Sequence, residues 1–194
     1  VGRLAQHEEG GHPVRRGERG RRVPRRGEPV GLGELAPHPR PEHEPHPERR
    51  PALVTGASSG IGAATAQALA AAGHPVILAA RRVDRLEELA AKLVADGAEA
   101  VALPIDLADP SSIDACAEAA ADALGPIDVV IANAGQISSS TALSSDPDEF
   151  ARNVQINLLG TQRLTARLGP AMVGRGHGDL VFVTSDVVAR PRTH

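Results

Sequence analysis

The chain has 194 residues, 41% of them hydrophobic, and a formal net charge of −3. This length and this hydrophobic content suffice for one domain with a buried core. Neither this charge nor its distribution predicts binding to nucleic acid or to a membrane surface. No apolar run approaches the roughly 18 residues of a membrane-spanning helix, and the amino-terminal segment has no apolar signal core. The single cysteine, Cys116, cannot form an internal disulfide. We therefore expect a cytoplasmic protein.

Residues 1–50 contain 11 Arg and 8 Glu, together with many Pro and Gly and few large apolar side chains. Such a segment cannot bury enough apolar surface to offset the entropy of ordering it, so we predict a disordered tail. Two alternatives stay open. One is a basic arm that touches phosphates, although no aromatic side chain is present for stacking on bases. The other is a non-native extension, read through upstream of a true start near Pro51.

From residue 51 onward, short apolar runs alternate with helical patterns, which predicts a single α/β domain over 51–194. In chain order we predict a strand at 52–55, a helix at 60–72, a strand at 75–80, a helix within 83–97, a strand at 100–107, a helix at 110–124, a strand at 127–135, a long helix at 147–173 and a strand at 179–185. Near-continuous apolar strands between amphipathic helices indicate a doubly wound, mostly parallel sheet of the Rossmann type.

The predicted helices carry their own boundary signals and one apolar face each. Asp109 and Asp146 stand as N-caps before prolines, and Gly97 suits a helix stop. The predicted faces are Leu86, Leu89, Leu93 and Val94; Ile113, Cys116, Ala120 and Leu124; and Phe150, Val154, Asn157, Leu158 and Thr161.

The segment 55–62, TGASSGIG, lies between the first predicted strand and the first predicted helix. Gly56, Gly60 and Gly62 lack the Cβ that would keep a dinucleotide's pyrophosphate away from backbone N–H groups at a helix N-terminus. Ser58 and Ser59 add hydroxyls that can bond to phosphate or ribose. The alternative is a tight turn of small residues needed only for packing.

The residues at the end of the second predicted strand indicate whether the cofactor is NAD or NADP. An acid at this point would bind the ribose 2′-OH of NAD, but the chain continues from Ala80 into Arg81 and Arg82. Guanidinium groups pair with a 2′-phosphate, so the sequence favours NADP over NAD, with Arg81 as the expected contact. Alternatively, these arginines belong to a solvated loop.

Taken together, these motifs resemble those of the classical short-chain dehydrogenase/reductase family, in order and spacing, across residues 52–194. The matching positions are Thr55, Gly56, Gly60, Ile61 and Gly62 in the glycine turn, Asp106 and Leu107 after the third strand, Asn133, Ala134 and Gly135 after the fourth, Asn157 in the long helix, and Ser185 after the fifth.

The resemblance implies hydride transfer between a nicotinamide and the carbon of a small-molecule carbonyl or alcohol. It implies that Asp106 and Leu107 contact the adenine, and that 133–135 lies beside the cofactor ribose. Ser185 would bond to the substrate oxygen, and Asn157 would hold a water in a proton relay. It also implies a homo-oligomer formed through the long helix. From the residues alone, an Asn157 satisfied by backbone and an ordinary strand-end Ser185 stay open.

The chain departs from the family in one respect. The family uses a tyrosine as proton donor and a lysine four residues later, but this chain contains no tyrosine, and its one lysine, Lys92, falls in the helix after the second strand. We interpret the chain as truncated after the fifth strand, which would leave that strand as an exposed edge and the chain inactive. The alternatives are a non-catalytic NADP(H)-binding module and a fragment without function of its own. We predict no metal site.

Overall fold

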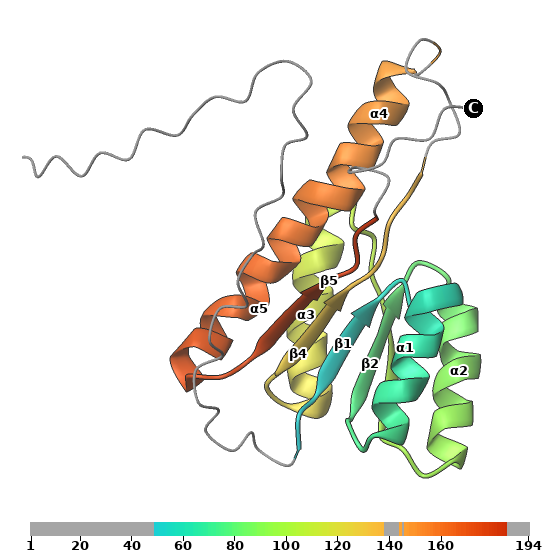
Figure 1. The fold of residues 1–194 in the computed structure, drawn as a ribbon, viewed down its shortest axis with the longest axis vertical. Coiled ribbons are helices and arrows are strands. Elements are labelled where there is room, and N and C mark those ends of the chain that lie inside the picture. The colour runs from blue at the N-terminus through green and yellow to red at the C-terminus, as the bar shows by residue number, and fades with distance from the viewer. Residues whose placement is uncertain (1–48, 138–143, 145, 186–194) are drawn as a thin grey trace, which may run out of the picture. The chain divides into compact units, whose positions relative to one another are not determined.

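The computed structural model describes residues 49–137, 144 and 146–185, all within the unit Glu44–His194. Five strands form one sheet, in the spatial order β3-β2-β1-β4-β5, and every neighbouring pair is parallel (Figure 1). The strands are β1 (Ala52–Thr55), β2 (Val76–Ala80), β3 (Ala100–Pro104), β4 (Val129–Ala132) and β5 (Asp179–Phe182). Because the order reverses direction at β1, the sheet is doubly wound, as the sequence predicts.

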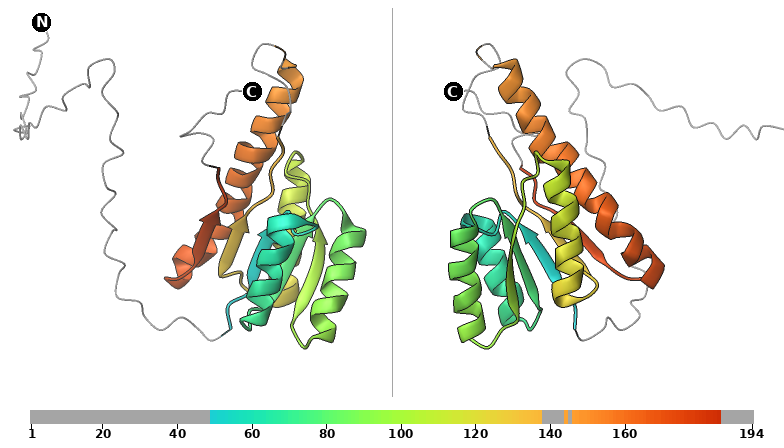
Figure 2. Two further views of the ribbon diagram at one scale, coloured as in Figure 1. Left: turned by 45° about the vertical axis from the view of Figure 1, so that its right-hand side comes forward. Right: turned by 180° about the vertical axis from the view of Figure 1, so that it is seen from behind.

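Helices cover both faces of the sheet (Figures 1 and 2). The helices α1 (Gly60–Ala71) and α2 (Val83–Ala95) cover one face, and α3 (Pro110–Leu124) and α5 (Thr161–Arg175) cover the other. Before α5, the chain forms α4 (Pro147–Val154) and a π-helical segment, η1 (Gln155–Gly160), in one continuous rod. Within the described part of the chain, no helix is both long and apolar enough to cross a bilayer.

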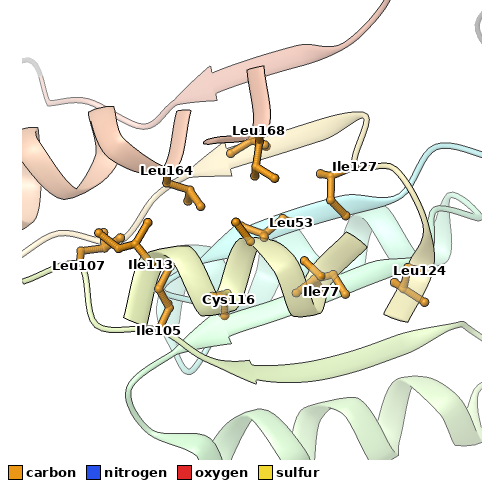
Figure 3. Packing of buried hydrophobic residues seen from close by; sticks show 14 of the residues in the cluster. Leu53, Ile77, Ile105, Leu107, Ile113, Cys116, Leu124, Ile127, Leu164 and Leu168 are labelled. Carbon is orange, nitrogen blue, oxygen red and sulfur yellow. The ribbon is translucent and has the colours of Figure 1, made fainter. Parts of the chain in front are cut away.

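Two apolar cores follow from the alternation of side chains along β1. Leu53 points to the α3 and α5 side, whereas Ala52 and Val54 point to the α1 and α2 side. Figure 3 shows the first core, where Cys116 of α3 and Leu164 of α5 pack around Leu53. A parallel strand that is covered by helices on both faces is buried on both faces, which explains the near-continuous apolar runs in the sequence.

The predicted helix boundaries agree with the observed caps. Asp109 accepts a hydrogen bond from the backbone N–H of Ser111, and Asp146 accepts one from Asp148. The predicted apolar face of α3 is buried throughout. On α2, by contrast, the predicted face is only partly buried. Leu86 and Leu93 are the buried residues of that helix, and Val94 is 54% exposed.

The long helix differs from its predicted face. Phe150 and Leu158, expected to face the sheet, are 62% and 61% exposed. Two causes combine. The rod extends beyond the sheet at α4 (Figure 1), and the π segment shifts the contact stripe. The buried stripe runs instead through Ile156, Gly160, Leu164, Leu168 and Met172.

The strand β5 lies at one edge of the sheet, as expected. Among the described residues its one strand neighbour is β4, and the side chains of Val181 and Phe182 are 45% and 51% exposed.

Two arginines that the sequence places in the tail belong to the folded domain. Arg49 donates to both carboxylate oxygens of Glu99 and to the carbonyl of Leu124, and Arg50 pairs with Asp179 at 2.6 Å. These partners lie 50 to 129 residues away in sequence. No local pattern distinguishes such arginines from those of the preceding polar segment.

Candidate functional site

A cleft of about 650 Å³ opens at the carboxyl edge of the sheet, above the ends of β1 to β4. Strand ends, the first turn of α1 and part of η1 all contribute to it. The lining residues are Gly56, Ser58, Ser59, Ile61, Ala80, Arg81, Arg82, Ile105, Asp106, Leu107, Asn133, Ala134, Gly135, Gln136 and Ile156. The cleft thus brings together nearly all the sequence-predicted binding residues, in the position where doubly wound sheets bind ligands.

The three glycines of the turn serve different purposes. Gly56 has a φ of +71°, and a Cβ there would lie 2.9 Å from Asn133 Nδ2. A Cβ on Gly62 would overlap the carbonyl oxygen of Gly56. Close backbone packing therefore requires glycine at both positions. Gly60 has a φ of +56°, and nothing lies within 4 Å of its missing Cβ, which leaves open space over the start of α1.

One buried hydroxyl joins the turn to the loop after β4. Thr55 Oγ1 accepts hydrogen bonds from the backbone N–H groups of Asn133 and Ala134, at 3.1 and 3.0 Å, and donates to the carbonyl of Ile131. In turn, Asn133 Nδ2 donates a hydrogen bond of 3.0 Å to the carbonyl of Thr55. This reciprocal arrangement fixes the glycine turn relative to 133–135.

The first turn of α1 presents an uncompensated positive end. A helix leaves its first N–H groups without intrahelical partners. Ser59, the N-cap, makes no side-chain capping bond, and the first turn contains no acidic residue. The partial positive charge of the helix dipole therefore faces the cleft, which favours an anionic ligand.

Arg82 lies closer to the turn than Arg81 does. Its Nη2 donates to Ser58 Oγ at 2.9 Å and to Ser59 Oγ at 2.7 Å, and its Nε donates to Ser58 Oγ at 3.2 Å. Arg81 is exposed and lines the cleft. The bonds of Arg82 place a guanidinium and two hydroxyls side by side at the cleft wall, a pairing that the sequence alone does not reveal.

The segment after β3 is held by its own hydrogen bonds. Asp106 Oδ1 accepts from the backbone N–H of Ala108, and the backbone N–H of Asp106 donates to Ser112 Oγ in α3. Leu107 is 5% exposed and belongs to the core on the α3 side. Asp106 and Leu107 thus form a fixed wall of the cleft.

The predicted catalytic residues differ in their surroundings. Asn157 Oδ1 accepts from the backbone N–H of Gln136 at 2.8 Å, and Asn157 Nδ2 donates to the carbonyl of Gln136 at 2.7 Å. Backbone therefore satisfies the carboxamide, although from a segment 21 residues away. Ser185 is exposed and follows β5, whose ladder extends by a bond from Val183 N–H to the Ala132 carbonyl.

A second groove, of about 740 Å³, lies between the carboxyl-terminal ends of α1 and α2 at the opposite edge of the sheet. Its charges are balanced internally, because Arg49 pairs with Glu99 and both Lys92 and Asp96 line it. The carboxyl-edge cleft, with its helix N-terminus and arginines, is the better candidate site. No group of three His, Cys, Asp or Glu able to hold a metal occurs in the ranges that the structure describes.

The sheet order, the crossover helices and the cleft define a Rossmann-type α/β domain. Residues 50–194 match the short chain dehydrogenase family, and the chain therefore belongs to that family.

Known relatives agree with this assignment. The chain is 42% identical over 135 residues to a glycine betaine reductase of Emericella nidulans, and 38% identical over 137 residues to a fatty acyl-CoA reductase of Acinetobacter baylyi. These matches cover 70% and 69% of this chain but only 11% and 46% of those proteins.

Solved structures are similar in the same region. An alcohol dehydrogenase from Thermococcus sibiricus, complexed with 5-hydroxy-NADP, is 36% identical with a TM-score of 0.71. An actinorhodin polyketide ketoreductase with NADPH is 31% identical, also with a TM-score of 0.71. Each match covers 75% of this chain, and 62% and 57% of the respective structures, so this chain spans less than two thirds of their length.

Proposed function

We propose that the cleft binds NADP(H) and that the protein is an NADP-dependent oxidoreductase acting on a small carbonyl or alcohol. The observation that carries the proposal is the open N-terminus of α1, with Gly60 unobstructed and Arg82 beside it on Ser58 and Ser59. A pyrophosphate accepts hydrogen bonds from such N–H groups, and guanidinium and hydroxyl groups donate to a 2′-phosphate. The two solved relatives described above, bound to NADP-type ligands, support this choice.

The residues present fit the cofactor. The glycine turn admits a diphosphate without side-chain obstruction, and the two residues directly after β2 are arginines rather than an acid that would repel a 2′-phosphate. Asp106 and Leu107 would form the adenine side, and residues 133–135 the ribose side. When bound, the nicotinamide supplies or accepts the hydride, while Ser185 would orient the substrate oxygen through its hydroxyl.

The two arginines after β2 separate NADPH from NADH. We expect Arg82→Ala and Arg81→Ala each to weaken NADPH binding about tenfold or more and NADH binding little, because only NADPH carries the phosphate that they would contact. Fluorescence titration of both nucleotides measures this, with Arg85→Ala, an exposed arginine of α2, as control. Equal losses for NADPH and NADH in both variants would reject the 2′-phosphate contact.

A second candidate is a non-catalytic NADP(H)-binding module. It is favoured by the absence of tyrosine from the 194 residues, since the family's proton donor is a tyrosine. Both candidates share the same cofactor cleft and differ in turnover alone.

The long helix also supports the expected homo-oligomer. Phe150 and Leu158 present large apolar side chains to solvent on this rod. Apolar surface of that kind is typical of contacts between subunits.

A further inference from the structure

The π segment η1 lies against the cleft. π-Helical turns are rare and occur frequently at functional sites, because the extra residue per turn displaces backbone and side chains from the regular helix. Here the wide turn spans Gln155–Gly160, and its buried residue Ile156 lines the cleft directly. The turn therefore belongs to the cleft as well as to the long helix.

At its carboxyl-terminal end, this turn contacts the wall after β3 through a glycine. A Cβ on Gly160 would overlap the carbonyl oxygen of Leu107, and would lie 2.8 Å from Leu107 Cβ and 3.0 Å from Leu107 C. Two of these three atoms are backbone, which cannot move aside as a side-chain end can. A helical glycine costs roughly 0.5–1 kcal/mol relative to alanine, and this close approach is its structural reason.

In its middle, the same turn contacts the wall after β4 through Asn157. The carboxamide makes two hydrogen bonds, of 2.8 and 2.7 Å, to the N–H and the carbonyl of one residue, Gln136. Gln136 lines the cleft next to Gly135. Because these bonds go to the peptide groups on both sides of the Gln136 Cα, they fix the position of this residue as well as its orientation.

We propose that Gly160 and Asn157 are positioning residues, whose shared π turn sets the separation of the two cleft walls and so the affinity for the nucleotide. Leu107 and Gln136 follow strands β3 and β4, which lie on opposite sides of β2 and β1 in the sheet. Both walls are attached to one rigid turn, so a displacement of either wall requires the turn to move. The inference rests on the proposed nucleotide function.

The variant Gly160→Ala tests the inference in the full chain. We expect at least tenfold weaker NADPH binding, because the added methyl group pushes the Leu107 segment away from the turn. Nucleotide fluorescence is a clean probe, since the chain contains no Trp or Tyr. Gly169→Ala is the matched control, because nothing lies within 4 Å of its missing Cβ in the same helix. We expect it to bind as the wild type does.

A destabilised control separates positioning from general loss of stability. Leu164→Ala removes a buried side chain of α5 one turn beyond Gly160, and this side chain does not itself line the cleft. At a temperature where all variants are folded, we expect Leu164→Ala to retain NADPH affinity within about threefold of wild type. An equal loss in Leu164→Ala and Gly160→Ala would overturn the proposal, as would unchanged affinity in Gly160→Ala.

Amide hydrogen exchange gives a readout that needs no nucleotide. We expect exchange at the Gln136 N–H to accelerate in Gly160→Ala, although the atoms nearest the added methyl group belong to Leu107 on the opposite wall, and to stay near wild type in Gly169→Ala. Asn157→Ala, which removes the acceptor of that N–H, gives the upper limit and serves if Gly160→Ala does not fold. Unchanged exchange overturns the coupling. A wild-type chain that fails to bind NADPH would reject the proposed function instead, and the exchange result would still decide whether the turn couples the walls.

Discussion

Cys116 is the one thiol of the chain, and its surroundings determine its chemistry. It is 2% exposed and belongs to the apolar core on the α3 side of the sheet (Figure 3). This burial raises the pKa of the Cys116 thiol from 9.0 to about 11. A thiol that keeps its proton is a poor nucleophile, so the structure gives Cys116 a packing role.

The raised pKa predicts a stability loss at alkaline pH. Between pH 9 and about 11 the native thiol holds a proton that the unfolded chain has lost, so the free energy of unfolding falls as pH rises. Below pH 9 the contribution is fully present, and the total loss is about 2–3 kcal/mol. Urea unfolding across this window measures it, and few other groups titrate there because the chain has one Lys and no Tyr. A Cys116→Ala variant with an equally steep alkaline decline would contradict the assignment.

Among the elements, the segment before β1 braces the amino edge of the sheet. Arg49 donates to Glu99, the residue before β3, and Arg50 donates to Asp179 of β5, so two adjacent residues hold the amino ends of both outer strands. The two ion pairs differ in exposure. The Arg50 side chain is 13% exposed and that of its partner Asp179 is 48% exposed, whereas those of Arg49 and Glu99 are 52% and 53% exposed.

This difference predicts unequal effects on stability. We expect Arg50→Ala to lower the free energy of unfolding by about 1.5–3 kcal/mol, because it removes a partly buried charge-assisted hydrogen bond. Arg49→Ala should cost less, about 1 kcal/mol or below, since solvent screens its ion pair. Urea unfolding of the two variants makes the comparison. If Arg49→Ala proves the more destabilising, the bracing of β5 by Arg50 is not a major interaction.

The connection between α3 and α5 is also electrostatic at its surface. Arg163 and Arg167 both pair with Asp114, and the hydrogen bond from Arg163 is the main cause that lowers the pKa of the Asp114 carboxyl. The carboxylate therefore stabilises the native state above its usual titration range, and this stabilisation is lost as pH falls through its lowered pKa.

For the whole molecule, binding and catalysis can be tested apart. We expect NADPH to raise the melting temperature, with a gain of about 2.7 kcal/mol in unfolding free energy at a hundredfold excess over Kd. We expect no carbonyl reduction by the 194-residue chain, because it contains no tyrosine to protonate a developing alkoxide. Loss of NADPH absorbance in the presence of carbonyl compounds measures turnover. Measurable turnover would show that another residue supplies the proton.

Much of the fold follows from short-range signals. The apolar runs of β1, β2 and β4, the caps Asp109 and Asp146, and the stop at Gly97 are each encoded within a few residues. The glycine turn likewise has a local signature, so its place at the cleft is predictable once the strands are known.

Other features depend on partners far away in sequence. The residue pattern does not indicate the π turn. Because the prediction assumes a regular α-helix there, the predicted buried face through Phe150 and Leu158 is wrong. Gly160 is the one local hint, because a glycine inside a helix calls for a packing reason. The bonds from Asn157 to Gln136 appear only when two segments meet.

The sequence by itself determines the class of the domain, the order of its elements, the position of the glycine turn and the lack of a tyrosine, since all of these are local or compositional. The tertiary structure alone decides that Arg82 donates to the serines of the turn, that Arg49 and Arg50 pair with Glu99 and Asp179 of the folded domain, and that one wide helical turn joins both cleft walls. Such contacts depend on the packing of distant segments, which no window of the chain contains.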